Sequence, residues 1–582
     1  MLSLLFASEA HTYAAPRVIP GSVFSDLKVM KVFAFARNLY FDTIREADVS
    51  LTEDILSHPC GTKDDVLHRQ NIFRVFMKNP GFVGRLYKTL GEVKSLQKIR
   101  ASYDCSFAGG DDCDLLYLRA VNYIFFIKSY EIYLSNIILA FDGIDLSGDK
   151  SALNELFDYC EAEKAKLSSP DIAEPISKML SYFEGKTSIT GELTTKDGVF
   201  TGLNFDTDLT KIHSNNPKRK AFFDLLRSFE DLLGIYRNEY EIREKGASMF
   251  GGDSPGIYMP DRFTGFEKHF LLRLIYDLET DNGVDFTPMV NAVVKFHDTI
   301  DIAPMDQIFE EIRFFRLAHR TVEMLTEFSE NPLCFPEIDD GRTPLLSLEA
   351  VFDPVILTQK LADYQTERNS SNLPESKIRG IIANSVGFTP DKKMYVVTGP
   401  NNGGKTAFVR AAGLAVIFAL SGMPVPAKHA KISLLTNVLT HFTANETHSL
   451  ESGRLQDELA RLGVLIRESD DFTFAILNET FAGTNSVKAL DLFEDFLVTR
   501  DKIGLNVIYV THFHNIAFAA EEKSASDPIY KTVSNLIACV DESSGQRTYK
   551  VLPKNPSDTS YSKDIVESHR LDRNALRELT IR

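Results

Sequence analysis

A glycine-rich stretch of eight residues offers the clearest chemistry in this chain. Residues 399–406 read Gly-Pro-Asn-Asn-Gly-Gly-Lys-Thr and match G-x-x-x-x-G-K-[ST], the phosphate-binding loop of nucleotide-hydrolysing proteins. Glycines permit the tight turn that aims backbone N–H groups at phosphate oxygens, and a following helix adds the positive end of its dipole. Lys405 can reach the β- and γ-phosphates, while the Thr406 hydroxyl can hold Mg²⁺. We expect the nucleotide to be bound by the whole loop: Gly399, Pro400, Asn401, Asn402, Gly403, Gly404, Lys405 and Thr406.

A second candidate site follows an apolar segment further along the chain. Residues 472–477 are almost continuously apolar, as expected of a strand buried on both faces, and they end in Asn478-Glu479. Glu479 is suited to polarise an attacking water, although an ordinary exposed acid at a strand end is the alternative. Asn478 stands where an Asp would be expected to support Mg²⁺, and its amide oxygen is a hard but uncharged ligand. The expected metal ligands are therefore Thr406 and Asn478.

Two further apolar segments belong to this pattern: 394–397 leads into the phosphate loop, and 505–511 ends in His512-Phe513-His514. A histidine at such a strand end can hydrogen-bond a γ-phosphate or the attacking water. His512 is therefore a second catalytic candidate, with a structural histidine as the alternative.

These side chains need a sheet to position them. After residue 345 the pattern alternates between strands and helices, which favours a three-layer nucleotide-binding domain with a central sheet. Before residue 340 helical periodicity dominates, for example over 223–240 and 308–328. Residues 187–206 interrupt that pattern and predict one or two short strands or a hairpin.

Composition limits the possible classes of protein. The 582 residues predict roughly two to four domains. Six cysteines without a C-x-x-C pair argue against a disulfide framework or a zinc site and fit a reducing cytoplasm. No apolar run reaches the ~18 residues that span a bilayer, so we expect no membrane partner; the region 121–141 comes closest and predicts a buried helix.

The formal net charge of −17 restricts any nucleic-acid surface to a local basic patch. Each candidate cluster can equally be a solvated helix face. The candidates are Lys94, Lys98 and Arg100, and Lys218, Arg219, Lys220 and Arg227.

Taken in order, these motifs resemble the ATPase domain of the MutS family of DNA mismatch-repair and recombination proteins. Residues 398–406 are similar to the family's T-G-P-N-M-G-G-K-S, residues 477–485 to M-D-E-x-x-x-G-T-S, and residues 511–513 to T-H-Y. Shorter matches flank them: Ile382-Ala383-Asn384, Val425-Pro426-Ala427, Tyr549-Lys550-Val551 and Ser560-Tyr561-Ser562. The resemblance implies ATP and Mg²⁺ as cofactors and hydrolysis to ADP and phosphate.

The resemblance also implies a nucleotide site shared between two subunits. Ser452 is a plausible N-cap of an amphipathic helix with Leu455, Leu459, Leu462 and Ile466 on one face. In the family such a helix start points across a dimer interface at the partner's γ-phosphate, which would make ATP a clamp between subunits. A serine-capped surface helix is the alternative.

The resemblance divides the chain into three parts and exposes several departures. We expect an N-terminal connector- or core-like region at 1–110, a helical core and lever region at 111–340 with the β-rich insert around 187–206, and a MutS-type P-loop ATPase domain with C-terminal dimerisation elements at 341–582. The expected fold class is therefore a multidomain chain, mainly α-helical and then three-layer α/β of the ABC/MutS type.

No segment resembles the mismatch-reading domain with its Phe-x-Glu motif. Ala482 replaces an Arg, and Ile381 stands about where an adenine-stacking aromatic residue is common.

Two function classes remain open. The family resemblance favours a homodimeric DNA-binding ATPase that grips mismatched or structured DNA, with a MutL-like protein as a possible partner. The acidic charge balance favours an ATP-driven dimerisation switch that acts on a protein partner without DNA.

Overall fold

The computed structural model describes residues 3–7, 18–40, 44–104, 113–146, 152–181, 191–196, 199–205, 280, 283–341, 344–367, 373–374, 376–442, 454–541, 544 and 546–556. Contacts group the chain into two compact units. One comprises Met1–Val93, Asn136–Tyr159 and Ala303–Arg582, and the other comprises Lys94–Ser135 and Cys160–Ile302. The three-part division inferred from the sequence stays a prediction.

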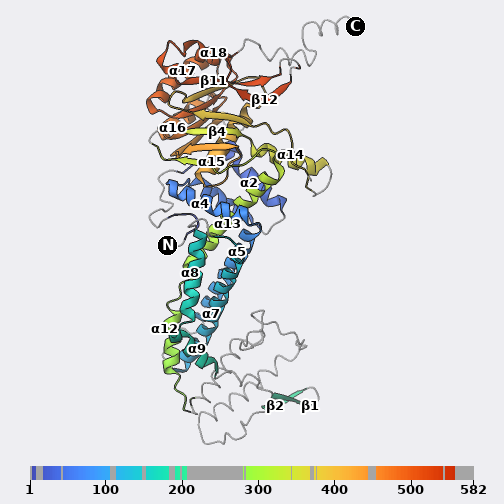
Figure 1. The fold of residues 1–582 in the computed structure, drawn as a ribbon, viewed down its shortest axis with the longest axis vertical. Coiled ribbons are helices and arrows are strands. Elements are labelled where there is room, and N and C mark those ends of the chain that lie inside the picture. The colour runs from blue at the N-terminus through green and yellow to red at the C-terminus, as the bar shows by residue number, and fades with distance from the viewer. Residues whose placement is uncertain are drawn as a thin grey trace. The chain divides into compact units, whose positions relative to one another are not determined.

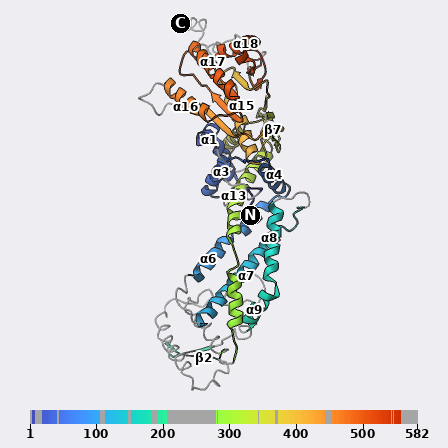
Figure 2. The same ribbon diagram turned by 90° about the vertical axis from the view of Figure 1, so that its left-hand side faces the viewer.

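In the first unit, a long helix organises the N-terminal helices. Helix α13 (Ala303–Phe328) packs against α2, α3, α4 and α5. Figure 1 labels α2, α4 and α5 near it, and Figure 2 labels α3 and α4. Aromatic rings fill this contact, and the centroids of Phe73 and Phe315 lie 5.1 Å apart. The helical periodicity predicted at 308–328 is confirmed. The N-terminal helices are α1 (Gly21–Leu27), α2 (Val29–Leu39), α3 (Glu46–Ser57), α4 (Lys63–Lys78) and α5 (Phe82–Leu90).

The second unit is built from helices and one hairpin. Strands β1 (Gly191–Lys196) and β2 (Val199–Phe205) pair antiparallel, which confirms the hairpin expected within 187–206. Helix α7 (Cys113–Ala140), which crosses the boundary between the units, confirms the helix expected over 121–141. None of the helices that the structure describes is long and apolar enough to cross a membrane. The other helices are α6 (Val93–Asp104), α8 (Ala152–Leu167), α9 (Pro170–Ser181) and α12 (Thr287–His297).

A six-stranded sheet carries the predicted motifs within the first unit. Its order is β12-β11-β6-β10-β9-β8, and all neighbours are parallel except β11 and β12. The three apolar segments predicted as strands are β6, β9 and β10. The strand bounds are β6 (Met394–Thr398), β8 (Asn437–Phe442), β9 (Thr473–Asn478), β10 (Asn506–Val510), β11 (Val533–Val540) and β12 (Arg547–Leu552).

Helices cover both faces of this sheet. On one face α15 (Lys405–Leu420) packs so closely that Gly413 faces Ile476 of β9 and Leu27 of α1. On the other face the core joins the strands to α16 (Arg454–Glu468), α17 (Ser486–Ile503) and α18 (His514–Lys523), seen in orange and red (Figure 1). Parallel strands buried on both faces explain why β6, β9 and β10 are continuously apolar.

A smaller mixed sheet flanks the six-stranded one. Its order is β3-β7-β4-β5, with a parallel β3–β7 pair and antiparallel β7–β4 and β4–β5 pairs. Its strands are β3 (Glu337–Asp339), β4 (Leu346–Val351), β5 (Asn384–Phe388) and β7 (His429–Ser433), with α14 (Pro354–Glu367) after β4. The chain is thus multidomain and helix-rich with mixed sheets, as expected. The helix predicted at 223–240, the basic cluster at 218–227 and the 560–562 motif lie outside the described residues.

Candidate functional site

The phosphate-loop sequence adopts a backbone that its glycines require. Strand β6 is buried throughout, and the loop then turns with φ = 131° at Gly399, 58° at Asn402 and 93° at Gly404. A Cβ atom at Gly399 would lie 2.7 Å from the carbonyl oxygen of Ala538 on β11, so only glycine fits there. Gly404 is the N-cap of α15 and has no side chain that could accept from the first-turn amides. Such an uncapped helix start suits an anionic ligand.

The loop lysine is held against the loop itself. Lys405 is 6% exposed, and its Nζ donates to the carbonyl oxygens of Gly399 at 2.9 Å and Pro400 at 3.0 Å. Burial lowers the pKa of Lys405, and the charge of Arg547 acts in the same direction, whereas Glu479 opposes it. These electrostatic interactions bring Glu479 and Lys405, predicted separately, into one site.

Strand pairing carries the other predicted residues to the edge of the sheet where the loop begins. Thr511 N donates to Val397 O at 3.1 Å, and Glu479 N donates to Val510 O at 2.9 Å. Strand β10 therefore lies between β6 and β9, and the polar residues after both strands emerge on the same edge. A ligand at the carboxyl edge of a parallel sheet is the usual arrangement in open α/β folds.

Glu479 and His512 are in direct contact. His512 Nδ1 lies 2.5 Å from Glu479 Oε2. Since an ionised carboxylate can only accept, Nδ1 carries the proton and donates it. Glu479 has φ = 59°, a left-handed conformation that costs a non-glycine residue roughly 1–2 kcal/mol. Such strain persists only where the surrounding structure fixes it, as at functional sites.

Asn478 has the character of a cation ligand. It is 8% exposed, and its buried Oδ1 accepts no hydrogen bond within the described part of the chain. Leaving a buried acceptor unsatisfied costs about 1–3 kcal/mol, which a cation ligated by this oxygen would offset. The Thr406 hydroxyl belongs to an exposed residue in the first turn of α15. Two neutral hard oxygens fit Mg²⁺ chemistry.

The helix after Ser452 is present, but its buried face differs from the predicted one. Ser452 itself lies outside the described residues, and α16 begins at Arg454. Leu462 is buried as expected, whereas Leu459 is 40% exposed and Glu458 takes its place on the buried face at 2% exposure. The Leu459 prediction was wrong because the helix buries a stripe through 458, 462 and 465, one position away from it.

A cavity of about 290 Å³ opens beside the start of α15. Gly404, Ala407 and Phe408 form one side of it, while Ile382 and Tyr549 belong to the rest of the lining. Its size and mixed lining suit a nucleoside base next to bound phosphates.

The exposed aromatic side chain at this cavity is Tyr549, which the sequence did not indicate as a site residue. The Tyr549 Cδ1 atom lies 3.4 Å from where a Cβ of Gly404 would be, and Asn384 Nδ2 donates to its carbonyl oxygen at 3.2 Å. Ile381, expected near an adenine, is instead 6% exposed outside this lining, with its carbonyl oxygen accepting from Asn331 Nδ2 at 2.9 Å. The only sequence signal for Tyr549 was the Tyr-Lys-Val match.

His514 also belongs to the site. Burial lowers the pKa of His514, and the charges of Lys405 and His512 lower it further. The influence of both charges indicates that His514 lies near Lys405 and His512. The three residues His512-Phe513-His514 thus supply two imidazoles to this edge, one of which was predicted.

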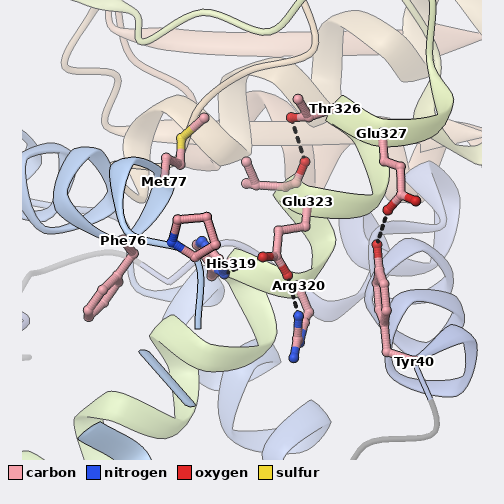
Figure 3. Close-up of a pocket in the computed structure, with 10 residues that line it drawn as sticks. Tyr40, Phe76, Met77, His319, Arg320, Glu323, Thr326 and Glu327 are labelled. Carbon is pink, nitrogen blue, oxygen red and sulfur yellow. Dashed lines mark hydrogen bonds and ion pairs between the residues drawn. The ribbon is translucent and has the colours of Figure 1, made fainter. Parts of the chain in front are cut away.

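A second cavity of about 330 Å³ lies between α2, α4 and α13 (Figure 3). Two pairs of its polar side chains interact: Arg320 Nη1 lies 2.6 Å from Glu323 Oε2, and the Tyr40 hydroxyl donates to Glu327 Oε2 at 3.3 Å. Burial and the two carboxylates raise the pKa of Tyr40, as expected in a negatively charged environment. Such a lining disfavours a triphosphate.

Comparison with known proteins finds similarity in the part of the chain that carries this site. MutS domain V matches residues 395–577. A DNA mismatch repair protein MutS from Rickettsia akari (strain Hartford) is 22% identical over 491 residues, covering 81% of this chain and 50% of the relative. MutS from Syntrophomonas wolfei subsp. wolfei is 27% identical over 186 residues, covering 31% of this chain and 20% of the relative. The chain spans about half the length, or less, of these curated relatives.

Proposed function

Because the chain belongs to the MutS family, we propose that it is a DNA-binding ATPase whose homodimer uses ATP to control its grip on mismatched, branched or otherwise structured DNA. The finer architecture we propose is a three-layer P-loop ATPase domain of the ABC/MutS type, working in the cytoplasm in repair or recombination. The observation that carries the proposal is the Glu479–His512 contact at the sheet edge beside the phosphate loop.

In this proposal the triphosphate lies on the loop amides and the start of α15, with the base in the 290 Å³ cavity. The Lys405 ammonium, which donates to the carbonyl oxygens of Gly399 and Pro400, moves its hydrogen bonds to the β- and γ-phosphates. Tyr549 stacks on the base. The backbone N–H groups of 404–406 neutralise phosphate charge.

Glu479 is proposed as the general base for hydrolysis. His512 engages Oε2, so we assign Oε1 to receive the proton of the attacking water. The imidazole holds the carboxylate in one orientation and reaches toward the γ-phosphate with its other edge. Thr406 and Asn478 would hold Mg²⁺, which neutralises charge on the phosphate oxygens when bound. With a neutral Asn478 in place of a carboxylate, we expect Mg²⁺ to be held less strongly.

The dimer and its partners complete the proposal. Ser452, just before α16, is proposed to cap the γ-phosphate bound by the second subunit, so that each ATP joins two chains. Hydrolysis then releases the pair. A MutL-like protein is a proposed partner that would bind the ATP-bound dimer.

The net charge of −17 supports a second candidate function. In that alternative, the same ATP-driven dimerisation acts on a protein partner and no DNA is bound. Both candidates require the same nucleotide chemistry, so the first test addresses the site.

Replacing Glu479 by Gln removes the base but keeps the size of the side chain. We expect Glu479→Gln to bind ATP with parental affinity, to hydrolyse it at least about 100-fold more slowly, and to accumulate as an ATP-bound dimer. Lys405→Ala should instead lose most nucleotide affinity. Equilibrium binding of a fluorescent ATP analogue, phosphate release and light scattering measure these three quantities. Phosphate release by Glu479→Gln at the parental rate would show that another group activates the water.

A further inference from the structure

A buried histidine joins two elements that the proposed reaction uses separately. His441 lies on β8 and is 2% exposed. Its Nδ1 is 2.8 Å from the Thr480 hydroxyl oxygen, and its Nε2 is 3.1 Å from the carbonyl oxygen of Glu458 in α16. One imidazole therefore bridges α16 and the turn that follows β9.

The direction of the two hydrogen bonds follows from the charge state of the ring. Burial lowers the pKa of His441 to about 4, and the nearby Arg461 charge acts in the same direction, so the ring is neutral at physiological pH. A backbone carbonyl can only accept, so Nε2 carries the proton and donates to Glu458 O. Nδ1 is then an acceptor, and the Thr480 hydroxyl donates to it. The bridge has a single tautomer and a fixed geometry.

Thr480 directly follows the proposed general base, in a turn under strain. Its neighbours Glu479 and Phe481 both have left-handed backbones, with φ of 59° and 70°. Two contacts of Thr480 hold the turn in place: the bond from its hydroxyl to His441, and the bond to its carbonyl oxygen from the Tyr509 hydroxyl at 2.8 Å. A strained conformation relaxes when its anchors are removed, so loss of the His441 contact reorients the Glu479 carboxylate.

The other end of the bridge lies in the first half of α16. Glu458 is the fifth residue of this helix, whose start follows the proposed dimer-facing Ser452. Arg461 Nη1 donates to Phe442 O at 2.8 Å, so a second polar contact holds the same half of α16 to β8. At the other end of α16, Asn437 Nδ2 of β8 donates to Glu468 O at 2.8 Å. Within the described residues, no hydrogen bond links the Asn437 side chain to the turn that carries Glu479. Movement of the helix start is therefore felt first at His441.

We propose that His441 is a positioning residue that couples the placement of α16 to the orientation of Glu479, so that hydrolysis responds to the second subunit's triphosphate at the start of α16. This inference rests on the proposed function, because it takes Glu479 as the base and α16 as the dimer-facing helix. His441 touches neither nucleotide nor water in this scheme, and it acts through Thr480 alone.

The test separates the two hydrogen bonds of the ring. The amide of His441→Gln can still donate to Glu458 O but places no acceptor at the former Nδ1 position that faces Thr480, while Thr480→Val removes the hydroxyl without changing the shape of the side chain. We expect each variant to lower kcat about tenfold and to leave the Kd for ATP within about twofold, with the double variant no slower than the worse single one. Thr480→Ser restores the hydroxyl and should recover most of the lost rate.

Asn437→Ala is the matched control. It removes a buried β8–α16 hydrogen bond of similar length, and we expect it to lower the melting temperature while kcat stays parental. An equal loss of kcat in Asn437→Ala, or parental kcat in Thr480→Val, overturns the inference. If His441→Gln does not fold, the Thr480→Val and Thr480→Ser pair still decides the question. If Glu479→Gln loses hydrolysis while Thr480→Val keeps the parental kcat, only the coupling through His441 is rejected. If Glu479→Gln hydrolyses ATP at the parental rate, the proposed function itself is rejected.

Discussion

Single side chains divide the proposed ATP site into a phosphate part and a base part. The loop residues bind the phosphates through backbone groups, and all nucleoside triphosphates carry the same phosphates. Nucleoside triphosphates differ in the base, which we place in the 290 Å³ cavity, where Tyr549 is the exposed aromatic side chain of the lining. Its carbonyl oxygen accepts from Asn384, and Asn384 Oδ1 accepts in turn from Val551 N at 2.8 Å. These two bonds fix the backbone from Tyr549 to Val551.

Removing the Tyr549 ring should weaken ATP binding without affecting hydrolysis. We expect Tyr549→Ala to raise the Kd for ATP about tenfold, because stacking of a base on an aromatic ring is worth ~1–3 kcal/mol. Leu552→Ala, which truncates another exposed side chain of β12, should leave the Kd unchanged. Titration with a fluorescent analogue measures both. A parental Kd for Tyr549→Ala would place the base elsewhere.

The sequence predicted the residues whose chemistry is local and missed those that depend on folding. The loop, Glu479 and His512 each follow an apolar strand, so pattern and residue type sufficed to bring them to one edge. The contact of His441 with Glu458 and Thr480 joins three segments distant in the chain, and no periodicity encodes it. Leu459 was predicted on the buried face because apolar residues usually are; the structure instead buries Glu458, whose carbonyl oxygen accepts from His441.

At the scale of elements, two helices next to the site differ in how the sheet holds them. Helix α15 is buried around its whole circumference, from Phe408 to Leu420. A Cβ atom at Gly413 would lie 2.6 Å from Leu27 Cδ1 and 3.0 Å from Ile476 Cδ1, so α15 is pressed between α1 and β9. Helix α16 buries one stripe only, and the nearest atom to a Cβ at its Gly463 is Arg467 Nη1 at 3.4 Å, the end of a long side chain.

The same substitution should therefore have opposite effects in the two helices. We expect Gly413→Ala to lower the free energy of unfolding by about 1–3 kcal/mol, because the added methyl group overpacks a closed contact. Gly463→Ala should leave stability unchanged or raise it by up to about 1 kcal/mol, because alanine favours a helix where space exists. Urea unfolding of both variants measures the difference. Equal effects would mean that α15 can shift to make room.

At the scale of the whole molecule, charge decides between the two candidate functions. A net charge of −17 repels nucleic acid in general, so DNA binding needs a local basic surface. On α6, Lys98 is exposed, while Arg100 donates to Ile300 O at 3.1 Å and lies over the Phe126 ring. Arg100 therefore has a structural role within its unit, and the patch is smaller than the sequence suggested.

DNA binding through phosphate contacts predicts a steep dependence on salt. We expect four-way-junction or mismatched duplex DNA to change the ATPase rate, and DNA affinity to fall at least about tenfold between 50 and 200 mM salt. The measurement is steady-state phosphate release and fluorescence anisotropy at both salt concentrations, with linear duplex as the comparison. If none of these DNAs changes the ATPase rate or the fluorescence anisotropy, the ATP-driven switch that acts on a protein partner is the remaining candidate function.

The unequal support of α15 and α16 separates two properties that many nucleotide switches combine. The phosphate loop continues into α15, which is buried on all sides. We therefore expect the loop to keep nearly the same conformation in different nucleotide states. Helix α16, before which the second chain is proposed to dock, is held by one apolar stripe and by polar contacts to β8 along its length, so we expect it to move more readily than α15. Nucleotide affinity and the rate of hydrolysis thus depend on different helices. Substitutions in α16 can therefore change the hydrolysis rate during evolution without weakening nucleotide binding.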